Sequence, residues 1–272
     1  LDFEIPDARE ESVEYLWYVG DYPSFDERNK KVARSLARIF EAADVSYGIL
    51  YEDEKNAGND IRRVGEEGLF EMLAMENIET FESVEYDTMV TTDPHAYNTF
   101  VNEYEQFGWE RGDDVEHYTQ VVEDLVESGA LPLSGTELDT RATFHDPCHL
   151  GRYNDEFEAP RAVLSSTGAD LDEMPRNRND SYCCGGGGGG LWLDPDEDEK
   201  PSEERIREAL EDTTGGDDVD QFVVSCPMCM TMYEDGMKSG GYEDDIEVVD
   251  LAEMVWDALE AGEGTETPVA AD

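Results

Sequence analysis

The feature that most constrains the fold of this chain is an internal repeat, offset by about 130 residues. Residues 88–100 match residues 221–233: each stretch has an apolar strand, a hydroxyl residue, a proline just after the turn and an apolar helix start. Two further matches precede this one in each half: Gly20-Asp21 corresponds to residues 144–148, and residues 55–58 correspond to residues 182–185. All three matches occur in the same order in both halves. The chain is therefore predicted to be a duplication, joined near residues 131–140, where Pro, Gly, Ser and Thr cluster.

Each half alternates short apolar runs with longer segments of helical period, which predicts strands and helices in turn. The expected strands lie near residues 15–19, 47–51, 89–90, 222–224 and 246–249, and the expected helices span 27–43, 64–75, 121–128 and 251–259. This alternation favours an α/β fold, with two duplicated Rossmann-like lobes and largely parallel sheets. The predicted domains are 1–135 and 136–261, followed by a disordered tail at 262–272, and residues 194–203 are expected to be an acidic surface or disordered insertion.

Acidic residues dominate the composition: 69 Asp and Glu stand against 19 Lys and Arg, a formal net charge of −50. This excess excludes nucleic acid and anionic lipid as electrostatic partners. The hydrophobic share, 39%, is too high for a disordered chain. Because the acids are spread over the whole sequence, the charge is interpreted as adaptation to a high-salt cytosol, where self-repulsion is screened.

The sequence contains neither an apolar run of membrane-spanning length nor a signal-peptide pattern. A cytoplasmic location is therefore expected, with the cytoplasmic face of a membrane as an alternative. The chain begins at Leu1. Any membrane anchor or additional cofactor domain is expected to lie outside it.

All five cysteines lie in the second half, at Cys148, Cys183, Cys184, Cys226 and Cys229. An odd number of cysteines argues against a disulfide framework, and their positions at turns after strands argue against unrelated core residues. Cys148 ends a strand, at the sheet edge where α/β proteins bind ligands. These five thiols are predicted to ligate a metal centre.

The residues around the thiols support ligation. Glycines at 185–190 allow the backbone to turn after Cys183-Cys184, and Gly185 and Gly186 bring N–H groups close to a negatively charged cofactor. Cys226-Pro227-Met228-Cys229 places two thiols at a helix start, where unpaired N–H groups favour thiolate. Since two cysteines precede the glycine run, it is not interpreted as a dinucleotide fingerprint, and the sequence has no P-loop or nucleophile elbow.

Three motifs carry a resemblance to a known family. They are His145-Asp146-Pro147-Cys148-His149-Leu150-Gly151-Arg152-Tyr153, Ser181-Tyr182-Cys183-Cys184-Gly185 and Ser225-Cys226-Pro227-Met228-Cys229. The second half resembles the cysteine-rich CCG domain of the B-type and D-type heterodisulfide reductase subunits, the C-type subunit of anaerobic glycerol-3-phosphate dehydrogenase, the glycolate oxidase iron–sulfur subunit, lactate-utilisation proteins and membrane-associated iron–sulfur oxidoreductases. The first half is similar to the amino-terminal repeat of the same family.

The resemblance implies a [4Fe–4S] cluster, of cubane or non-cubane type, held by the five cysteines. It also implies electron transfer between a flavoprotein dehydrogenase or electron-transfer flavoprotein and another iron–sulfur domain or a membrane quinone. Two alternatives remain: a catalytic subunit that reduces a disulfide, and a docking scaffold stabilised by zinc, which needs only four ligands.

The first half departs from the family pattern. Where its repeat would carry cysteines, the sequence has Asp21, Asn56, Asp93 and Ala96. One cluster is therefore expected, in the second half. Either the three polar residues converge on a hard cation, or they fill a vacated, hydrated pocket.

Further residues are expected around the cluster. His145 and His149 flank Cys148 and are candidates to ligate iron or to donate a hydrogen bond to sulfur; the alternative is a structural role. Arg152 is the foremost of four nearby arginines that either raise the cluster's reduction potential or pair with surface acids; the others are Arg161, Arg176 and Arg178. An apolar shell that excludes water is expected from Met228, Met230, Met232 and Trp192.

Overall fold

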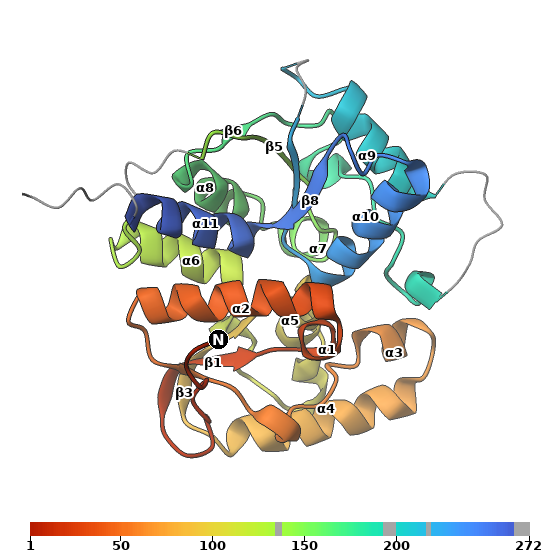
Figure 1. The fold of residues 1–272 in the computed structure, drawn as a ribbon. Coiled ribbons are helices and arrows are strands. Elements are labelled where there is room, and N and C mark those ends of the chain that lie inside the picture. Colours follow the sequence, from red (N-terminus) through yellow and green to blue (C-terminus); the bar gives the residue numbers. More distant parts are fainter. Residues whose placement is uncertain (134–137, 193–199, 216–218, 264–272) are drawn as a thin grey trace, which may run out of the picture.

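The computed structural model describes residues 1–133, 138–192, 200–215 and 219–263. They form two lobes, of which the first lies below and the second above in the view of Figure 1. Each lobe has a parallel sheet of four strands, and the two sheets share one strand order: β2-β1-β3-β4 in the first and β6-β5-β7-β8 in the second. This arrangement confirms the predicted duplicated α/β fold.

The strands are short. In the first lobe they are β1 (Val13–Tyr18), β2 (Tyr47–Gly48), β3 (Tyr86–Thr91) and β4 (Val115–His117). In the second lobe they are β5 (Arg141–Phe144), β6 (Asp170–Leu171), β7 (Gln221–Val224) and β8 (Glu247–Asp250). Because all strands in a sheet run the same way, the turns after β1, β3, β5 and β7 lie at the carboxyl edges of the sheets, where α/β proteins place ligands.

Helices connect the strands. The first lobe has α1 (Asp21–Phe25), α2 (Glu27–Ala42), α3 (Asn59–Arg63), α4 (Glu67–Glu82), α5 (Pro94–Asn102) and α6 (Tyr118–Glu127). The second lobe has α7 (Gly151–Asn154), α8 (Glu158–Ser166), α9 (Pro201–Glu211), α10 (Pro227–Gly240) and α11 (Leu251–Glu263).

Equivalent helices begin in the same way in both lobes. In α5, Pro94 occupies the first turn and the Asp93 side chain accepts a hydrogen bond from the N–H of His95. In α10, Pro227 occupies the same place, but Cys226 stands at the N-cap and its side chain caps no N–H group. The thiol of Cys226 therefore remains available for another partner.

Some expected boundaries were wrong. The helix expected at 64–75 corresponds to α4, which begins later, at Glu67, and runs on to Glu82; Gly65, with a left-handed backbone (φ 94°), separates it from α3. The expected insertion at 194–203 lies partly outside the described residues, but its end is helical, since α9 begins at Pro201. Helix α11 runs through Glu263, and the rest of the expected tail lies outside the described residues.

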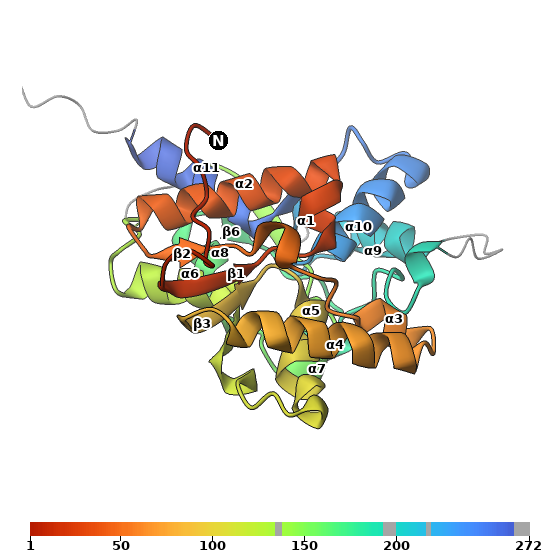
Figure 2. The ribbon, with the colours of Figure 1, turned by 90° about the horizontal axis from the view of Figure 1, so that it is seen from below.

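The lobes pack against each other through two equivalent pairs of helices: α2 of the first lobe packs on α11 of the second, and α6 of the first packs on α8 of the second. Helices α1 and α10 are also in contact, and they lie side by side in Figures 1 and 2. One core cluster runs across this boundary, from Trp17 in β1 to Phe144 in β5. The lobes therefore form one packed unit, with the starts of α5 and α10 near their boundary.

Polar contacts reinforce the boundary. Arg28 of α2 forms ion pairs with Glu234 and Glu253 of the second lobe, at 2.7 and 2.6 Å. The Tyr118 hydroxyl donates to Asp250 Oδ1 at 2.7 Å, and both residues are buried. Burial raises the pKa of Asp250 to about 7, although the hydrogen bonds from Ala252 and Tyr118 oppose this shift.

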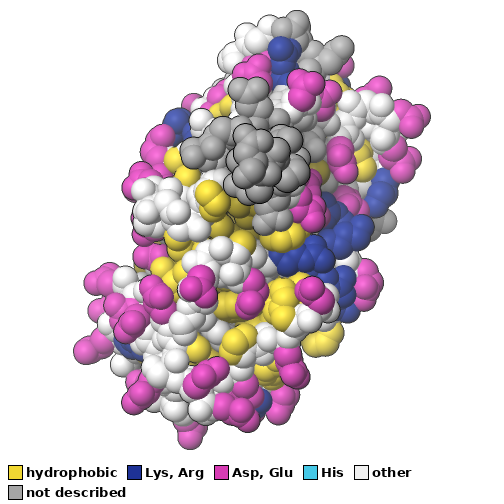
Figure 3. All heavy atoms as spheres, turned by 60° about the vertical axis from the view of Figure 1, so that its left-hand side comes forward, with side chains coloured by type: hydrophobic (Ala, Val, Ile, Leu, Met, Phe, Trp, Pro, Cys, Tyr) yellow, Lys and Arg dark blue, Asp and Glu magenta, His cyan; other side chains and the backbone are white. Residues whose placement is uncertain are grey.

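The charge pattern is visible on the molecular surface. Acidic side chains are spread over the face shown in Figure 3, whereas basic side chains gather in one part of it. Across the part of the chain that the structure describes, no helix combines the length and the apolar character needed to cross a membrane.

Candidate metal centre

The structure brings the five thiols together in an unbroken chain of contacts. Cys184 Sγ and Cys229 Sγ lie 3.5 Å apart. Cys183 lies within hydrogen-bonding contact of both Cys148 and Cys184, and Cys226 lies within such contact of Cys229. Three separate segments supply these residues: the turn after β5, the glycine-rich segment and the start of α10.

The glycines after Cys184 have specific steric roles. Gly185 adopts a left-handed backbone (φ 87°), and its N–H donates to Cys183 Sγ at 3.4 Å. A Cβ atom on Gly186 would lie 2.9 Å from Met228 Cγ and 2.8 Å from Met232 Cγ. Larger residues at these two positions would strain the turn or displace the methionines, so the glycines allow both adjacent thiols to reach the same region.

Two of the thiols are disposed to ionise. Burial acts to raise the pKa of Cys226, but hydrogen bonds from Cys229 and His95 lower it to about 6. Hydrogen bonds from Cys148 and Cys184 lower the pKa of Cys183 as well. Thiolate is the form that binds metal. The pKa values of Cys148, Cys184 and Cys229 are raised instead, so the preference for thiolate is confined to Cys183 and Cys226.

Two histidines contact opposite ends of the thiol chain. His149 Nδ1 lies 3.4 Å from Cys148 Sγ, and His95 Nδ1 lies 3.9 Å from Cys226 Sγ. The ring centroids of these histidines are 4.3 Å apart. His95 comes from the first lobe, and the sequence analysis did not identify it as a site residue.

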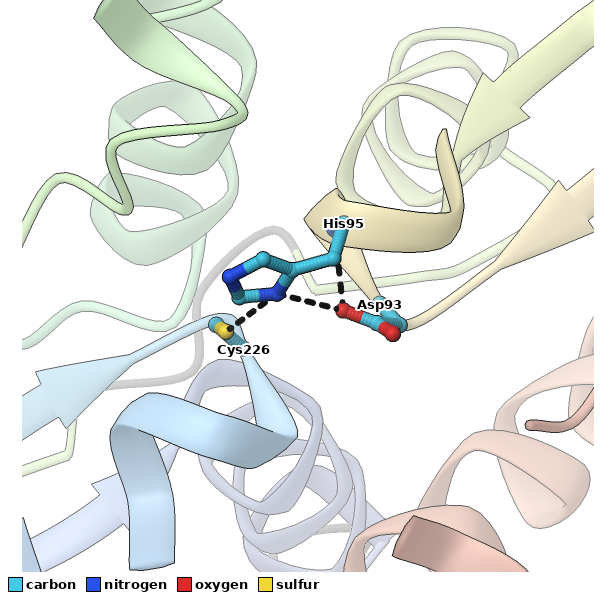
Figure 4. A group of neighbouring side chains, drawn as sticks. All are labelled: Asp93, His95 and Cys226. Atoms are coloured by element: carbon cyan, nitrogen blue, oxygen red, sulfur yellow. Dashed lines mark hydrogen bonds and ion pairs between the residues drawn. The ribbon is translucent and has the colours of Figure 1, made fainter. Parts of the chain in front are cut away.

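Figure 4 shows how His95 is held between Asp93 and Cys226. His95 Nδ1 lies 3.0 Å from Asp93 Oδ1, and candidate ligand atoms of the three residues lie within 4.8 Å of one another. Burial acts to lower the pKa of His95, but the Asp93 carboxylate and the Cys226 sulfur raise it well above its usual value. A positive charge from the first lobe therefore faces a thiol of the second.

The other predicted neighbours of the cysteines have different surroundings. The buried ring of His145 contacts the Tyr233 hydroxyl, with Nδ1 at 3.1 Å. Arg152 donates from Nε to the carbonyl of Asn179 at 3.2 Å and from Nη2 to the carbonyl of Ser181. Arg152 thus orders the segment that leads to Cys183.

Three of the four arginines considered for tuning the cluster are paired with acids. Arg161 binds Asp146 and Glu173, with closest contacts of 2.6 Å to each. Arg176 pairs with Glu204 and Glu208, and Arg178 pairs with Glu158. For these three arginines, the structure therefore favours pairing with acids over tuning of the cluster's reduction potential. Since Asp146 immediately precedes Pro147-Cys148, Arg161 also anchors the turn that carries the first thiol.

A fifth arginine, Arg205 of α9, was missed. Its side chain is fully buried, and Nη1 lies 2.8 Å from Glu208 Oε2. Within the described residues, however, none of its guanidinium nitrogens makes a well-directed hydrogen bond. The charge of Arg205 acts to lower the pKa values of His145 and Tyr233, whereas nearby thiols act to raise them. A signal existed in the sequence, because Arg205 shares the buried face of α9 with Ile206 and Ala209.

The equivalent place in the first lobe is a pocket of about 720 Å³. Asp21, Asn56 and Asp93 line it, and Asn56 donates a hydrogen bond to Asp21. Ala96 is buried and is not among the lining residues. Aromatic rings also line the pocket.

Comparison with known proteins agrees with this geometry. The sequence model of the CCG cysteine-rich domain matches the chain twice, at residues 16–100 and 142–234. The chain belongs to this cysteine-rich domain family. The family match confirms the resemblance found in the sequence, and each of its two segments lies within one lobe.

Three relatives illustrate the family. A probable iron-sulfur-binding oxidoreductase, FadF, of Bacillus subtilis is 41% identical over 93% of this chain and 36% of its own length. An EtfAB:quinone oxidoreductase of Syntrophomonas wolfei is 36% identical over 91% of this chain and 34% of its own. The D-type subunit of the heterodisulfide reductase of Methanosarcina barkeri is 27% identical over 93% of this chain and 61% of its own. The chain thus spans about a third of the first two relatives.

Proposed function

We propose that this CCG protein is an iron–sulfur electron-transfer domain with one cluster, bound by Cys148, Cys183, Cys184, Cys226 and Cys229. The observation that carries the proposal is the unbroken chain of contacts among five thiols from three separate segments. Two relatives carry names that describe iron–sulfur binding or quinone-linked oxidoreductase activity, which supports the proposal.

The residues present fit a negatively charged cluster of the [4Fe–4S] class. The Gly185 N–H already points at a sulfur, and Arg205 offers buried donors that lack well-directed acceptors. Such a cluster, when bound, accepts and releases single electrons. Five thiolates exceed the four that zinc takes, which favours iron–sulfur ligation over a zinc scaffold.

The chain itself shields and orients the site. Met228, Met230 and Tyr233 are almost fully buried beside the thiols, so they exclude water from that side. Arg152 binds the carbonyl groups of Asn179 and Ser181, just before Cys183, and Arg161 binds the Asp146 carboxylate, just before Cys148. His95 supplies positive charge beside Cys226, which stabilises that thiolate, and Arg205 adds a buried guanidinium that is paired with Glu208.

The partners are proposed from the relatives. We infer a flavoprotein, either a dehydrogenase or an electron-transfer flavoprotein, as donor, because one relative is named for EtfAB. The acceptor is another iron–sulfur domain or a quinone, reached through parts of a longer protein or complex. The setting is the cytoplasmic side of a membrane in a high-salt cytosol, as the charge of −50 suggests.

Anaerobic reconstitution with iron and sulfide, followed by metal and acid-labile sulfide analysis, tests the proposal. We expect roughly four iron atoms per chain and a broad visible absorbance that bleaches on reduction. A colourless protein with stoichiometric zinc after purification, and no iron uptake, would refute the proposal in favour of the scaffold.

Reduction of a disulfide is the second candidate, since one relative is a heterodisulfide reductase subunit. The absence of thiols at Asp21, Asn56 and Asp93 disfavours it, because chemistry that needs a pair of clusters lacks its second site. Turnover of a disulfide by the reconstituted, chemically reduced domain would support catalysis. Reoxidation by a one-electron acceptor without disulfide turnover supports electron relay.

A further inference from the structure

The first-lobe pocket lies beside the thiols and is open to solvent. Its volume, about 720 Å³, is in the range that proteins use for small organic ligands. His95 and Met228, which lie next to the cysteines, form part of its wall. The pocket therefore reaches from the surface to a residue in contact with Cys226.

Aromatic side chains surround the pocket. Phe25 and Trp192 are the most exposed of the large hydrophobic residues described, at 81% and 80%, and both line it. Phe25 belongs to α1 of the first lobe, whereas Trp192 lies in the turn Gly190–Trp192 of the second. Tyr18 and Tyr22 add two more rings. Exposed rings from both lobes around one pocket offer flat surfaces for a planar ligand.

The polar lining consists mainly of hydrogen-bond acceptors. Asn59 is 5% exposed, and its Nδ2 donates to Thr99 Oγ1 at 3.2 Å. Among the residues that the structure describes, neither Asn59 Oδ1 nor Asp60 Oδ1 has a hydrogen-bond partner, and both atoms are buried. A buried acceptor without a donor costs free energy, so a ligand that donates hydrogen bonds here recovers it.

The charged side chains of the lining are mostly acidic. Asp21, Asp26, Asp60 and Asp93 line the pocket, and the described lining contains no lysine or arginine. The positive charge of His95 is already paired with Asp93. Aromatic faces together with carboxylates attract organic cations and repel anions.

From these observations we infer that the vacated first-lobe site binds a planar aromatic molecule that carries positive charge and N–H donors. The rings of Phe25 and Trp192 stack on its faces, and the oxygens of Asn59 and Asp60 accept its hydrogen bonds. This inference goes beyond the proposed function, because the lobe without cysteines supplies most of the lining and binding requires no metal.

Proflavine is a suitable probe, since it is a planar tricyclic cation with two amino groups. Its binding to the reconstituted protein is measured by fluorescence anisotropy, and resorufin, a tricyclic anion of similar size, serves as the matched control. We expect one saturable proflavine site and at least about tenfold weaker resorufin binding. Iron and sulfide are measured in the same samples, so a failure of cluster binding is seen separately.

Three variants locate the site. Phe25→Ala and Trp192→Ala remove exposed rings, and we expect each to weaken proflavine binding about five- to tenfold. Asp60→Asn should weaken proflavine binding by a similar factor and reduce the difference in affinity between proflavine and resorufin. Tyr51→Ala and Asp113→Asn are the controls, because both residues are exposed and neither lines the pocket.

The controls should bind proflavine like the unchanged protein. The inference is overturned by either of two results: proflavine binds at many sites that none of the three pocket substitutions affects, or resorufin binds as tightly as proflavine. The first result would show that the dye simply follows the acidic surface. Retained iron in a variant that loses proflavine affinity would assign the loss to the pocket alone.

Discussion

The two lobes share one strand order and equivalent helix starts, yet their sites differ. In the second lobe, the five thiols follow one another in a chain of pairwise contacts, and the surrounding side chains are mostly buried. In the first, polar and small residues replace the thiols, and the same sheet edge opens as a pocket. The comparison shows that this fold supplies a place for a ligand at the sheet edge, while the residues on the turns decide its chemistry.

The lobes also complete each other's sites. His95 and Met228 occupy equivalent positions, each two residues after the N-cap of its helix. His95 crosses the boundary to contact Cys226, while Met228 crosses it to line the first-lobe pocket. The symmetric packing of the lobes is therefore part of both sites, and neither lobe alone presents a complete one.

The largest expected effect comes from removing a thiol. Cys229→Ser should abolish iron uptake nearly completely, because Cys229 contacts both Cys184 and Cys226 and joins the two halves of the thiol chain. Iron and acid-labile sulfide after anaerobic reconstitution measure the effect.

The equivalent first-lobe substitution, Ala96→Ser, is the matched control, since Ala96 and Cys229 are 1% and 2% exposed. It should leave iron content unchanged. Equal iron loss in both variants would show that disturbed packing, and not ligation, explains the result, and the contrast between the lobes would fail.

The second prediction concerns the buried contact between the lobes. Asp250→Asn should stabilise the protein by roughly 2–4 kcal/mol at pH 8, because the raised pKa makes ionisation of buried Asp250 costly. An asparagine Oδ1 still accepts from Tyr118 and from the Ala252 N–H, as Asp250 Oδ1 does at 2.7 and 2.9 Å.

The sign of the pH dependence follows from the same shift. Between about pH 4 and pH 7 the folded protein keeps a proton on Asp250 that the unfolded chain has released, so this residue's contribution to stability falls as pH rises. Asp250→Asn should remove that fall in denaturant unfolding measured from pH 4 to 8. Asp113→Asn, at an exposed first-lobe acid, should leave the profile as it was; an unchanged profile in Asp250→Asn contradicts the prediction.

The sequence was sufficient to predict the duplication and the α/β class, because apolar periodicity and turn residues recur in both halves. It also located the five cysteines on turns at one sheet edge, since strand order alone brings those turns together. It missed α3 and placed the start of α4 too early, at residue 64, because an isolated glycine such as Gly65 is often tolerated within a helix.

The contact between His95 and Cys226 was beyond prediction for a different reason. These residues are 131 positions apart and belong to different lobes, so their approach depends on how α2, α6, α8 and α11 pack. Arg205 was overlooked because basic residues were considered only near the cysteines in sequence. Its burial depends on the place of α9 against α10.

The third prediction tests that buried charge. Arg205→Met should lower the reduction potential of the reconstituted centre by roughly 60 mV, because losing a nearby positive charge disfavours added electrons. A redox titration monitored by electron paramagnetic resonance gives the value. Arg178→Met is the control: both arginines pair with an acid, but the Arg178 side chain is 41% exposed whereas that of Arg205 is fully buried, so the reduction potential of the Arg178→Met variant should stay near that of the unchanged protein. Equal shifts in both variants would remove the special role of Arg205.

The smallest effect expected separates the two histidines at the boundary. His95→Gln should lower the potential by roughly 30 mV, because the charge that Asp93 maintains on His95 is lost beside Cys226. His149 contacts Cys148 just as closely, but burial and the charge of His95 lower its pKa to about 3, so it is neutral. His149→Gln therefore removes no charge and should shift the potential much less. If His149→Gln shifted the reduction potential more than His95→Gln, contact with sulfur would matter more than charge. The first lobe would then shape this site but contribute little to its electrostatics.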